Sequence, residues 1–134
     1  MNSELAWESI ERAINALNRA GSATTRTHIQ KLLFFANVWK EPRTYEFEFV
    51  LHLHGPYSFE LDREIMAMEA FGRVASISDL AGYGAHYSTK PVDVDLNLQK
   101  LADWLGPKSS RQLEALATAS IAIISRSSSN EYGP

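Results

Sequence analysis

The hydrophobic residues near the start of the chain recur at the spacing of a helix. Ile10, Ile14 and Leu17 follow each other at intervals of four and three residues, and Gly21 then supplies a helix stop. After a short polar stretch, the segment 29–39 (IQKLLFFANVW) carries apolar residues on two sides. These patterns predict two helices, and the second should be the central one because it must be covered on both sides.

Hydroxyl residues mark the expected starts of three helices. Thr27 with Gln30 fits a capping box, in which each side chain bonds a backbone N–H group of the other residue. Ser109 with Gln112 fits the same box before the last helix of the chain. Ser58 precedes the third helical segment, FELDREIMAMEAF, and its hydroxyl should accept from the first free amides there.

Residues 45–53 alternate almost strictly between apolar and polar side chains, which predicts a β-strand. The face that we expect to be buried consists of Tyr45, Phe47, Phe49, Leu51 and Leu53. The strand runs into the sequence HGPYS, where Gly55 permits an unusual backbone angle and Pro56 fixes the next one. We therefore predict a strand-to-helix corner at this point.

The second half of the chain shows weaker patterns. Residues 73–77 and 86–89 predict a small hairpin, and a short helix and an alanine-rich helix follow. The polar, serine-rich residues 126–134 indicate a flexible tail. The order of elements predicts a single domain, residues 1–125, of the mostly helical α+β class. It has a winged-helix-like core with an extra strand between helices 2 and 3, a small β-hairpin wing and two C-terminal helices.

Composition narrows the classes of protein to which the chain can belong. Its 134 residues carry a net charge of −3 and include no cysteine, which excludes disulfides, thiolate metal sites and cysteine nucleophiles. No apolar run approaches the ~18 residues that span a bilayer, and the N-terminus lacks the features of an export signal. We expect a protein of the reducing cytoplasm with no membrane partner.

His52 and His54 are two residues apart and could face one metal ion, because histidine is the commonest metal ligand. A metal site needs a third ligand, and no diagnostic spacing supplies one, so a structural or interface role is the favoured interpretation. The usual catalytic and nucleotide-binding motifs do not occur in the sequence. We expect no enzyme activity, no cofactor and no resident metal.

The third predicted helix is acidic through Glu60, Asp62, Glu64 and Glu69. Helical geometry disperses these carboxylates, so a solvated helix face explains them better than acid–base catalysis does. Carboxylates would face the DNA phosphates and base edges, so they also argue against insertion of this helix into a DNA groove.

Two groups of basic residues are candidates for a nucleic-acid site. One group surrounds the turn between the first two helices, and the other lies on or beside the predicted wing. Together they are Arg26, His28, Lys31, Arg73, His86 and Lys90. Either group could contact phosphates, although an acidic chain is not typical of a dedicated DNA-binding protein.

Two segments resemble the YwgA-like family of small bacterial and archaeal proteins: the helix motif Ile29–Phe35 (IQKLLFF) and the turn motif His54–Ser58 (HGPYS). The similarity covers roughly residues 25–118, and HGPYS is its most specific part. The resemblance implies a winged-helix-like fold. The family is also similar to SocA-like Panacea antitoxin domains and to the toxin-binding C-terminal domain of a macrodomain-bearing antitoxin.

The resemblance implies a non-catalytic, antitoxin-like module of a regulatory or defence system. We expect it to bind a protein partner, such as a toxin or another defence component, through the Gly-Pro turn and the acidic third helix. The expected contact residues are His54, Tyr57, Glu60, Arg63 and Glu64. A DNA-binding winged-helix regulator is the alternative function, and a homodimer through the alanine-rich helix stays open.

Overall fold

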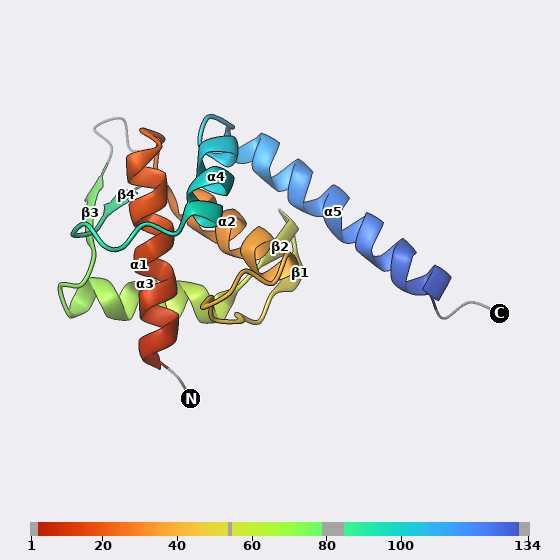
Figure 1. The fold of residues 1–134 in the computed structure, drawn as a ribbon, viewed down its shortest axis with the longest axis horizontal. Coiled ribbons are helices and arrows are strands. Elements are labelled where there is room, and N and C mark those ends of the chain that lie inside the picture. The colour runs from red at the N-terminus through yellow and green to blue at the C-terminus, as the bar shows by residue number, and fades with distance from the viewer. Residues whose placement is uncertain (1–2, 54, 79–84, 132–134) are drawn as a thin grey trace.

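A computed structural model of the protein describes residues 3–53, 55–78 and 85–131 (Figure 1). Within these ranges the chain forms five helices and two small antiparallel sheets. In chain order the elements are α1 (Ser3–Arg19), α2 (Arg26–Val38), β1 (Val50–His52), β2 (Gly55–Tyr57), α3 (Phe59–Ala70), β3 (Ala75–Ser78), β4 (Ala85–Ser88), α4 (Leu96–Leu105) and α5 (Ser110–Glu131). The predicted class, mostly helical α+β with a small β wing and two C-terminal helices, is confirmed.

Helix α2 lies at the centre of the fold, where α1, α4, α5 and strand β2 contact it (Figure 1). Every residue of α2 from His28 to Ala36 is buried, which confirms the central position predicted from its two apolar sides. The buried run includes Gln30 and Lys31. Because buried polar groups cost free energy unless they are hydrogen-bonded, both side chains need partners inside the protein.

Thr25, and not Thr27, caps α2. The Thr25 hydroxyl accepts a hydrogen bond from the backbone N–H of His28 at 3.2 Å. The predicted Thr27–Gln30 capping box is therefore wrong. The helix begins at Arg26, so Gln30 lies more than one turn inside it and its amide is available for other contacts.

The two other predicted caps are confirmed. At the start of α3 the Ser58 hydroxyl accepts from the N–H of Leu61 at 3.0 Å. Before α5, Ser109 and Gln112 form the reciprocal box, with hydrogen bonds of 2.9 and 3.2 Å.

The strand predicted over residues 45–53 is confirmed only at Val50–His52, where β1 pairs with β2. Strand β2 occupies the Gly-Pro segment, so the predicted strand-to-helix corner is itself half of a hairpin. Leu51 and Leu53, which were expected to be buried, are 69% and 88% exposed. The hairpin thus presents its aliphatic side chains to solvent.

Residues 45–49 lie outside the two described sheets, although their side chains alternate. The N–H of Tyr45 donates to the Ser9 hydroxyl at 2.8 Å. The N–H of Phe47 donates to the Asn37 side-chain oxygen at 3.0 Å. Side chains from α1 and α2 thus replace a neighbouring strand as hydrogen-bond partners, and the aromatic half of the alternating pattern packs against the helices.

Strands β3 and β4 confirm the predicted hairpin wing, with Ala75 opposite Ser88 and Ser78 opposite Ala85. The loop expected between them lies outside the described residues. Buried Tyr87 fixes the wing to the body, because its N–H donates to the Thr24 carbonyl at 2.9 Å.

Helix α5 extends away from the body, and its far half lies beyond the other elements (Figure 1). Helix α5 continues to Glu131, so the part of the predicted flexible tail from residue 126 to residue 131 is helical, and its flexibility stays a prediction. No proline or glycine occurs between Pro107 and Gly133, so nothing in the sequence stops the helix earlier. None of the helices in the described ranges is both long and apolar enough to cross a bilayer.

Candidate functional site

The β1–β2 hairpin is fixed to the central helix by two buried side chains. The Gln30 side chain accepts from the Ser58 N–H at 2.9 Å and donates to the Ser58 carbonyl at 2.8 Å. The Lys31 ammonium donates to the Pro56 carbonyl at 2.7 Å. These contacts hold the end of β2 and the start of α3 in one position relative to α2.

Gly55 fixes the other side of the hairpin against α5. Its φ is +97°, a backbone angle that favours glycine. A Cβ atom at this position would lie 2.7 Å from the Thr118 hydroxyl oxygen and 3.3 Å from the Glu114 carbonyl oxygen. The glycine predicted for the turn is therefore required twice, for its backbone angle and for the close approach of α5.

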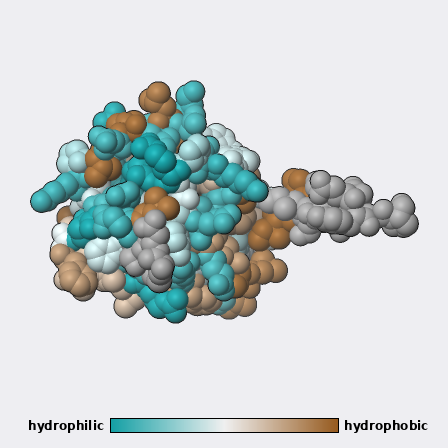
Figure 2. Space-filling view, turned by 60° about the horizontal axis from the view of Figure 1, so that its bottom comes forward, coloured by the Kyte–Doolittle hydropathy of each residue, from teal (hydrophilic) through white to brown (hydrophobic). Residues whose placement is uncertain are grey.

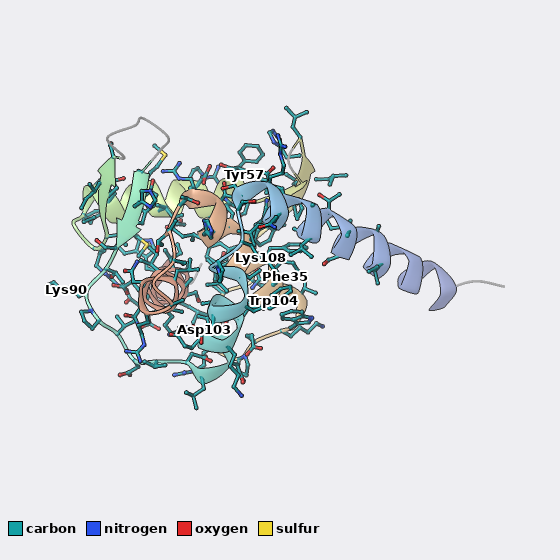
Figure 3. All side chains as sticks on the ribbon, turned by 90° about the horizontal axis from the view of Figure 1, so that it is seen from above. Phe35, Tyr57, Lys90, Asp103, Trp104 and Lys108 are labelled. Atoms are coloured by element: carbon teal, nitrogen blue, oxygen red, sulfur yellow. The ribbon has the colours of Figure 1, made fainter. Side chains whose placement is uncertain are left out.

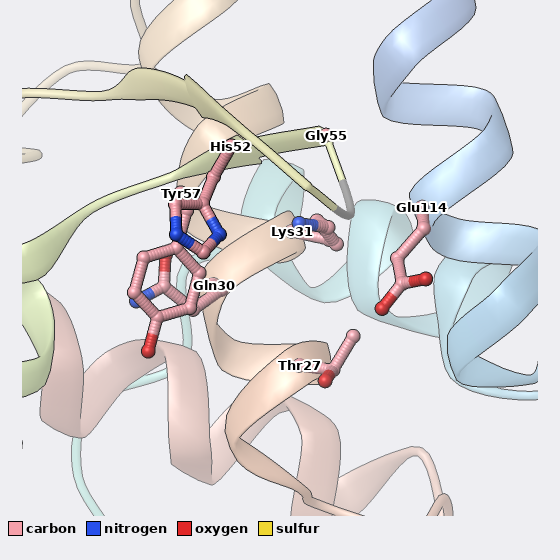
Figure 4. Close-up of a pocket in the computed structure, with 7 residues that line it drawn as sticks. All are labelled: Thr27, Gln30, Lys31, His52, Gly55, Tyr57 and Glu114. Carbon is pink, nitrogen blue, oxygen red and sulfur yellow. The ribbon is translucent and has the colours of Figure 1, made fainter.

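A cavity of about 230 Å³ lies where the hairpin, α2 and α5 meet (Figure 4). Its lining residues are Thr27, Gln30, Lys31, His52, Gly55, Tyr57 and Glu114. In Figure 4 the rings of His52 and Tyr57 lie on one side, and Glu114 reaches in from α5 on the other. Of the predicted partner residues that the structure describes, Tyr57 is the one that lines this cavity.

Lys31 is the buried charged group of this cavity, with 2% of the residue exposed. Burial lowers the pKa of its ammonium, because the charged form loses its hydration. The carboxylate of Glu114 raises the same pKa, but burial outweighs it. The ammonium thus has a neutral carbonyl as its hydrogen-bond partner and the Glu114 carboxylate as a nearby opposite charge.

Tyr57 continues the site toward α3. Its hydroxyl donates to the Asp62 carboxylate, which also accepts from Gln30 at 3.2 Å. Burial raises the Asp62 pKa, and the Gln30 hydrogen bond and the positive charge of Arg26 oppose that rise. Asp62 was expected only as part of a solvated face, yet it links the hairpin to α2.

Aromatic and aliphatic side chains surround the hairpin, and the rings of His52 and Tyr57 lie on its cavity side. The His52 ring lies 5.7 Å from the ring of Tyr57 and 5.5 Å from that of Phe59, measured between centroids. Phe59 is 51% exposed, and Leu51 and Leu53 on the hairpin are 69% and 88% exposed. We call Leu51, Leu53 and Phe59 the hairpin patch. Figure 2 shows hydrophobic side chains gathered where the arm formed by α5 leaves the body.

The predicted acidic face of α3 is corrected by the structure. The Glu60 carboxylate accepts from the Tyr45 hydroxyl at 2.8 Å and from the Glu48 N–H at 3.0 Å. The Glu64 carboxylate accepts from the indole N–H of Trp7 at 2.6 Å. Both carboxylates therefore hold neighbouring elements in place, because each lies within reach of a donor from another segment.

The remaining predicted partner residues differ in their surroundings. Arg63 is exposed on α3. His54 lies outside the described residues, so the His52–His54 pair is not placed. Within the described ranges, no group of three or more His, Asp or Glu residues could hold a metal ion.

The basic group near the start of α2 is not a free cationic surface, which corrects that expectation. His28 is buried, with its ring 2.7 Å from the Thr25 hydroxyl and 3.0 Å from the Lys108 carbonyl, and burial lowers its pKa. Lys31 is buried beneath the hairpin. Arg26 lies 3.7 Å from the Asp62 carboxylate. The helix start places these side chains inward, so phosphates could not reach them together.

The basic group near the wing is also dispersed. Arg73 is paired with Glu11 at 2.6 Å. His86 is half-buried on β4, while Lys90 is exposed just after this strand. Lys90 and Tyr57 lie on different sides of α1 in Figure 3. The two predicted basic groups therefore do not form one continuous surface with the hairpin.

No family model, curated protein or solved structure matches the chain. Its class is therefore defined by its own fold and site: a mostly helical α+β domain with a rigidly held apolar hairpin above a small cavity.

Proposed function

We propose that this protein is a non-catalytic interaction module that binds a partner protein through the hairpin patch. The observation that carries the proposal is the exposure of Leu51, Leu53 and Phe59 on a hairpin that is fixed from two sides. Leu51 and Leu53 are two residues apart and both exposed, and contiguous exposed apolar surface is typical of protein-binding sites. Their burial by a partner would provide most of the binding free energy.

The anchoring of the hairpin supports this proposal. Gln30 and Lys31 hold it to α2, and Gly55 lies directly against α5. A surface that is already ordered loses little conformational entropy on binding, so more of the contact energy appears as affinity. The patch thus combines exposure with preorganisation.

The resemblance of IQKLLFF and HGPYS to YwgA-like proteins suggests which class of protein the partner belongs to. It favours a toxin or another component of a defence system, held by an antitoxin-like domain. The net charge of −3 suits a partner surface of positive charge, because complementary potentials speed association. The alternative, DNA binding by a winged helix, has less support because His28 and Lys31 are buried.

A comparison of two exposed hairpins tests the proposal. Leu51→Ser/Leu53→Ser removes the two leucines of the patch, whereas Ile77→Ser alters a 72% exposed residue on the wing. Each variant and the wild type would be used to isolate partners from the native host, and the affinity of each recovered partner would then be measured with purified proteins. We expect a partner that binds the wild type and Ile77→Ser but loses at least tenfold in affinity for the double variant.

Equal binding of all three proteins, or recovery of no specific partner, would contradict the proposed function. Fluorescence anisotropy with mixed duplex DNA at low salt tests the alternative. Steeply salt-dependent binding that survives Leu51→Ser/Leu53→Ser would favour a DNA-binding protein instead.

A further inference from the structure

The cavity beneath the hairpin contains the buried, positively charged side chain of Lys31. The Lys31 ammonium has three donor hydrogens, and its carbonyl partner on Pro56 carries no net charge. Removing an ammonium from water costs several kcal/mol unless an anion pairs with it closely. Glu114 favours the charged form, but less than burial disfavours it. An anion that entered the cavity would therefore be stabilised by Lys31.

The size of the cavity restricts the anion. About 230 Å³ is below the range of about 300–1,000 Å³ that is typical of drug-sized ligands. A nucleotide or a large cofactor would not fit, whereas an acid of a few carbon atoms would. The rings of His52 and Tyr57 line one side of this space and suit an apolar body.

Glu114 restricts the charge of the ligand further. Its carboxylate lies across the cavity from the two rings, so a second negative charge on the ligand would be repelled. A ligand with one carboxylate can keep that group near Lys31 and direct its uncharged end toward the rings. Glu114 acts on the charge of Lys31, so a carboxylate paired with Lys31 is also repelled by Glu114, and a second carboxylate on the ligand would be repelled further.

We propose that the cavity is a binding site for a small monocarboxylic acid, whose carboxylate pairs with the Lys31 ammonium and whose apolar body lies against Tyr57 and His52. This site is distinct from the hairpin patch, and its existence does not depend on the proposed protein partner. The hairpin covers the cavity. The ligand would therefore contact the inner side of the hairpin, and the hairpin patch lies on its outer side.

Titration of the ¹⁵N-labelled full chain tests the proposal by NMR. The probes are isobutyrate, its neutral isostere isobutyramide, and the dicarboxylate succinate. We expect isobutyrate to cause saturable shifts in amide signals of α2, the hairpin and the first turns of α5. Isobutyramide should cause none, and succinate should bind at least tenfold more weakly. Equal shifts with isobutyrate and isobutyramide, or no saturable shift at millimolar isobutyrate, would overturn the proposal.

Substitutions of residues that line the cavity test ligand binding without removing the contacts that hold the hairpin. Thr27→Leu fills the cavity from α2 without removing a hairpin anchor, and it should abolish the isobutyrate shifts. Glu114→Gln removes the opposing charge and should tighten isobutyrate binding by about three- to tenfold. Glu46→Gln removes an exposed carboxylate outside the cavity and is the matched control. If Glu114→Gln and Glu46→Gln bind isobutyrate alike, or Thr27→Leu binds as the wild type does, the carboxylate site is refuted.

Discussion

Replacement of Gln30 with leucine should destabilise the fold more than a typical polar-to-apolar change. The Gln30 amide is buried and bonds both backbone groups of Ser58, where β2 passes into α3. Leucine has a similar volume, so the substitution mainly removes hydrogen bonds and leaves the packing in place. The expected loss therefore measures how strongly one side chain holds the hairpin to the central helix.

The magnitude follows from what the substitution leaves behind. The buried Ser58 N–H loses its acceptor, which costs about 1–3 kcal/mol. The Ser58 carbonyl keeps its bond from the Asp62 N–H at 3.2 Å, so the lost bond to that carbonyl costs about 0.5–1.5 kcal/mol. We expect the free energy of unfolding to fall by about 2–4 kcal/mol in total.

Urea denaturation followed by circular dichroism measures this change. With slopes of about 1–3 kcal/mol per molar urea, the midpoint should fall on the order of 1–2 M. Gln112→Leu is the matched control, because Gln112 bonds the Ser109 N–H at 2.9 Å in an exposed capping box. The free energy of unfolding of this control should fall by about 0.5–1 kcal/mol. If Gln30→Leu loses no more than Gln112→Leu, the assigned role of Gln30 is wrong.

Three further outcomes are expected from urea denaturation. Gly55→Ala should lower the free energy of unfolding by roughly 2–4 kcal/mol, because the added Cβ would meet α5. Gly72→Ala, at φ +77° with open space around it, should lower it by about 1 kcal/mol. Equal losses would contradict the close approach of α5 to Gly55. Thr25→Ala should lower the free energy of unfolding by about 1 kcal/mol, because Thr25 caps α2, and Thr27→Ala should lower it by less than about 0.5 kcal/mol. A larger loss for Thr27→Ala than for Thr25→Ala would support the Thr27–Gln30 capping box instead. Burial lowers the Lys31 pKa in the folded state, so folding carries a free-energy penalty for the charged ammonium at neutral pH. This penalty is relieved as pH rises through the lowered pKa toward the ordinary value of 10.5. Wild-type stability should therefore rise with alkaline pH relative to Lys31→Met, and a relative fall would show that the fold stabilises the ammonium.

The parts of the fold that depend on neighbouring residues could be predicted from the sequence. The cap at Ser58 and the box at Ser109 and Gln112 join groups within three residues, so the local pattern contains both partners. The helical stripes and the wing follow from the same short-range periodicity. The Gly-Pro turn was also predicted as a special backbone site, and Gly55 confirms it.

The errors arose where partners lie far apart in the sequence. Alternation over residues 45–53 predicted one strand, but Asn37 and Ser9 provide the hydrogen bonds that a neighbouring strand would have provided. Lys31 was expected among the basic side chains that could contact phosphates, yet it is buried. Its position depends on the carbonyl of Pro56 and on the packing of α5, and neither can be seen from the sequence around Lys31.

The contact between Gly55 and α5 also orders events during synthesis. The hairpin leaves the ribosome before the segment around Thr118 that covers Gly55. At about 5–20 residues per second, roughly 3–12 s separate the two. During that interval Leu51 and Leu53 are on a hairpin held from one side at most, which makes the nascent chain a substrate for chaperones. Until the segment around Thr118 has emerged, the nascent chain cannot present the finished patch, and a partner made at the same time must wait until α5 has docked.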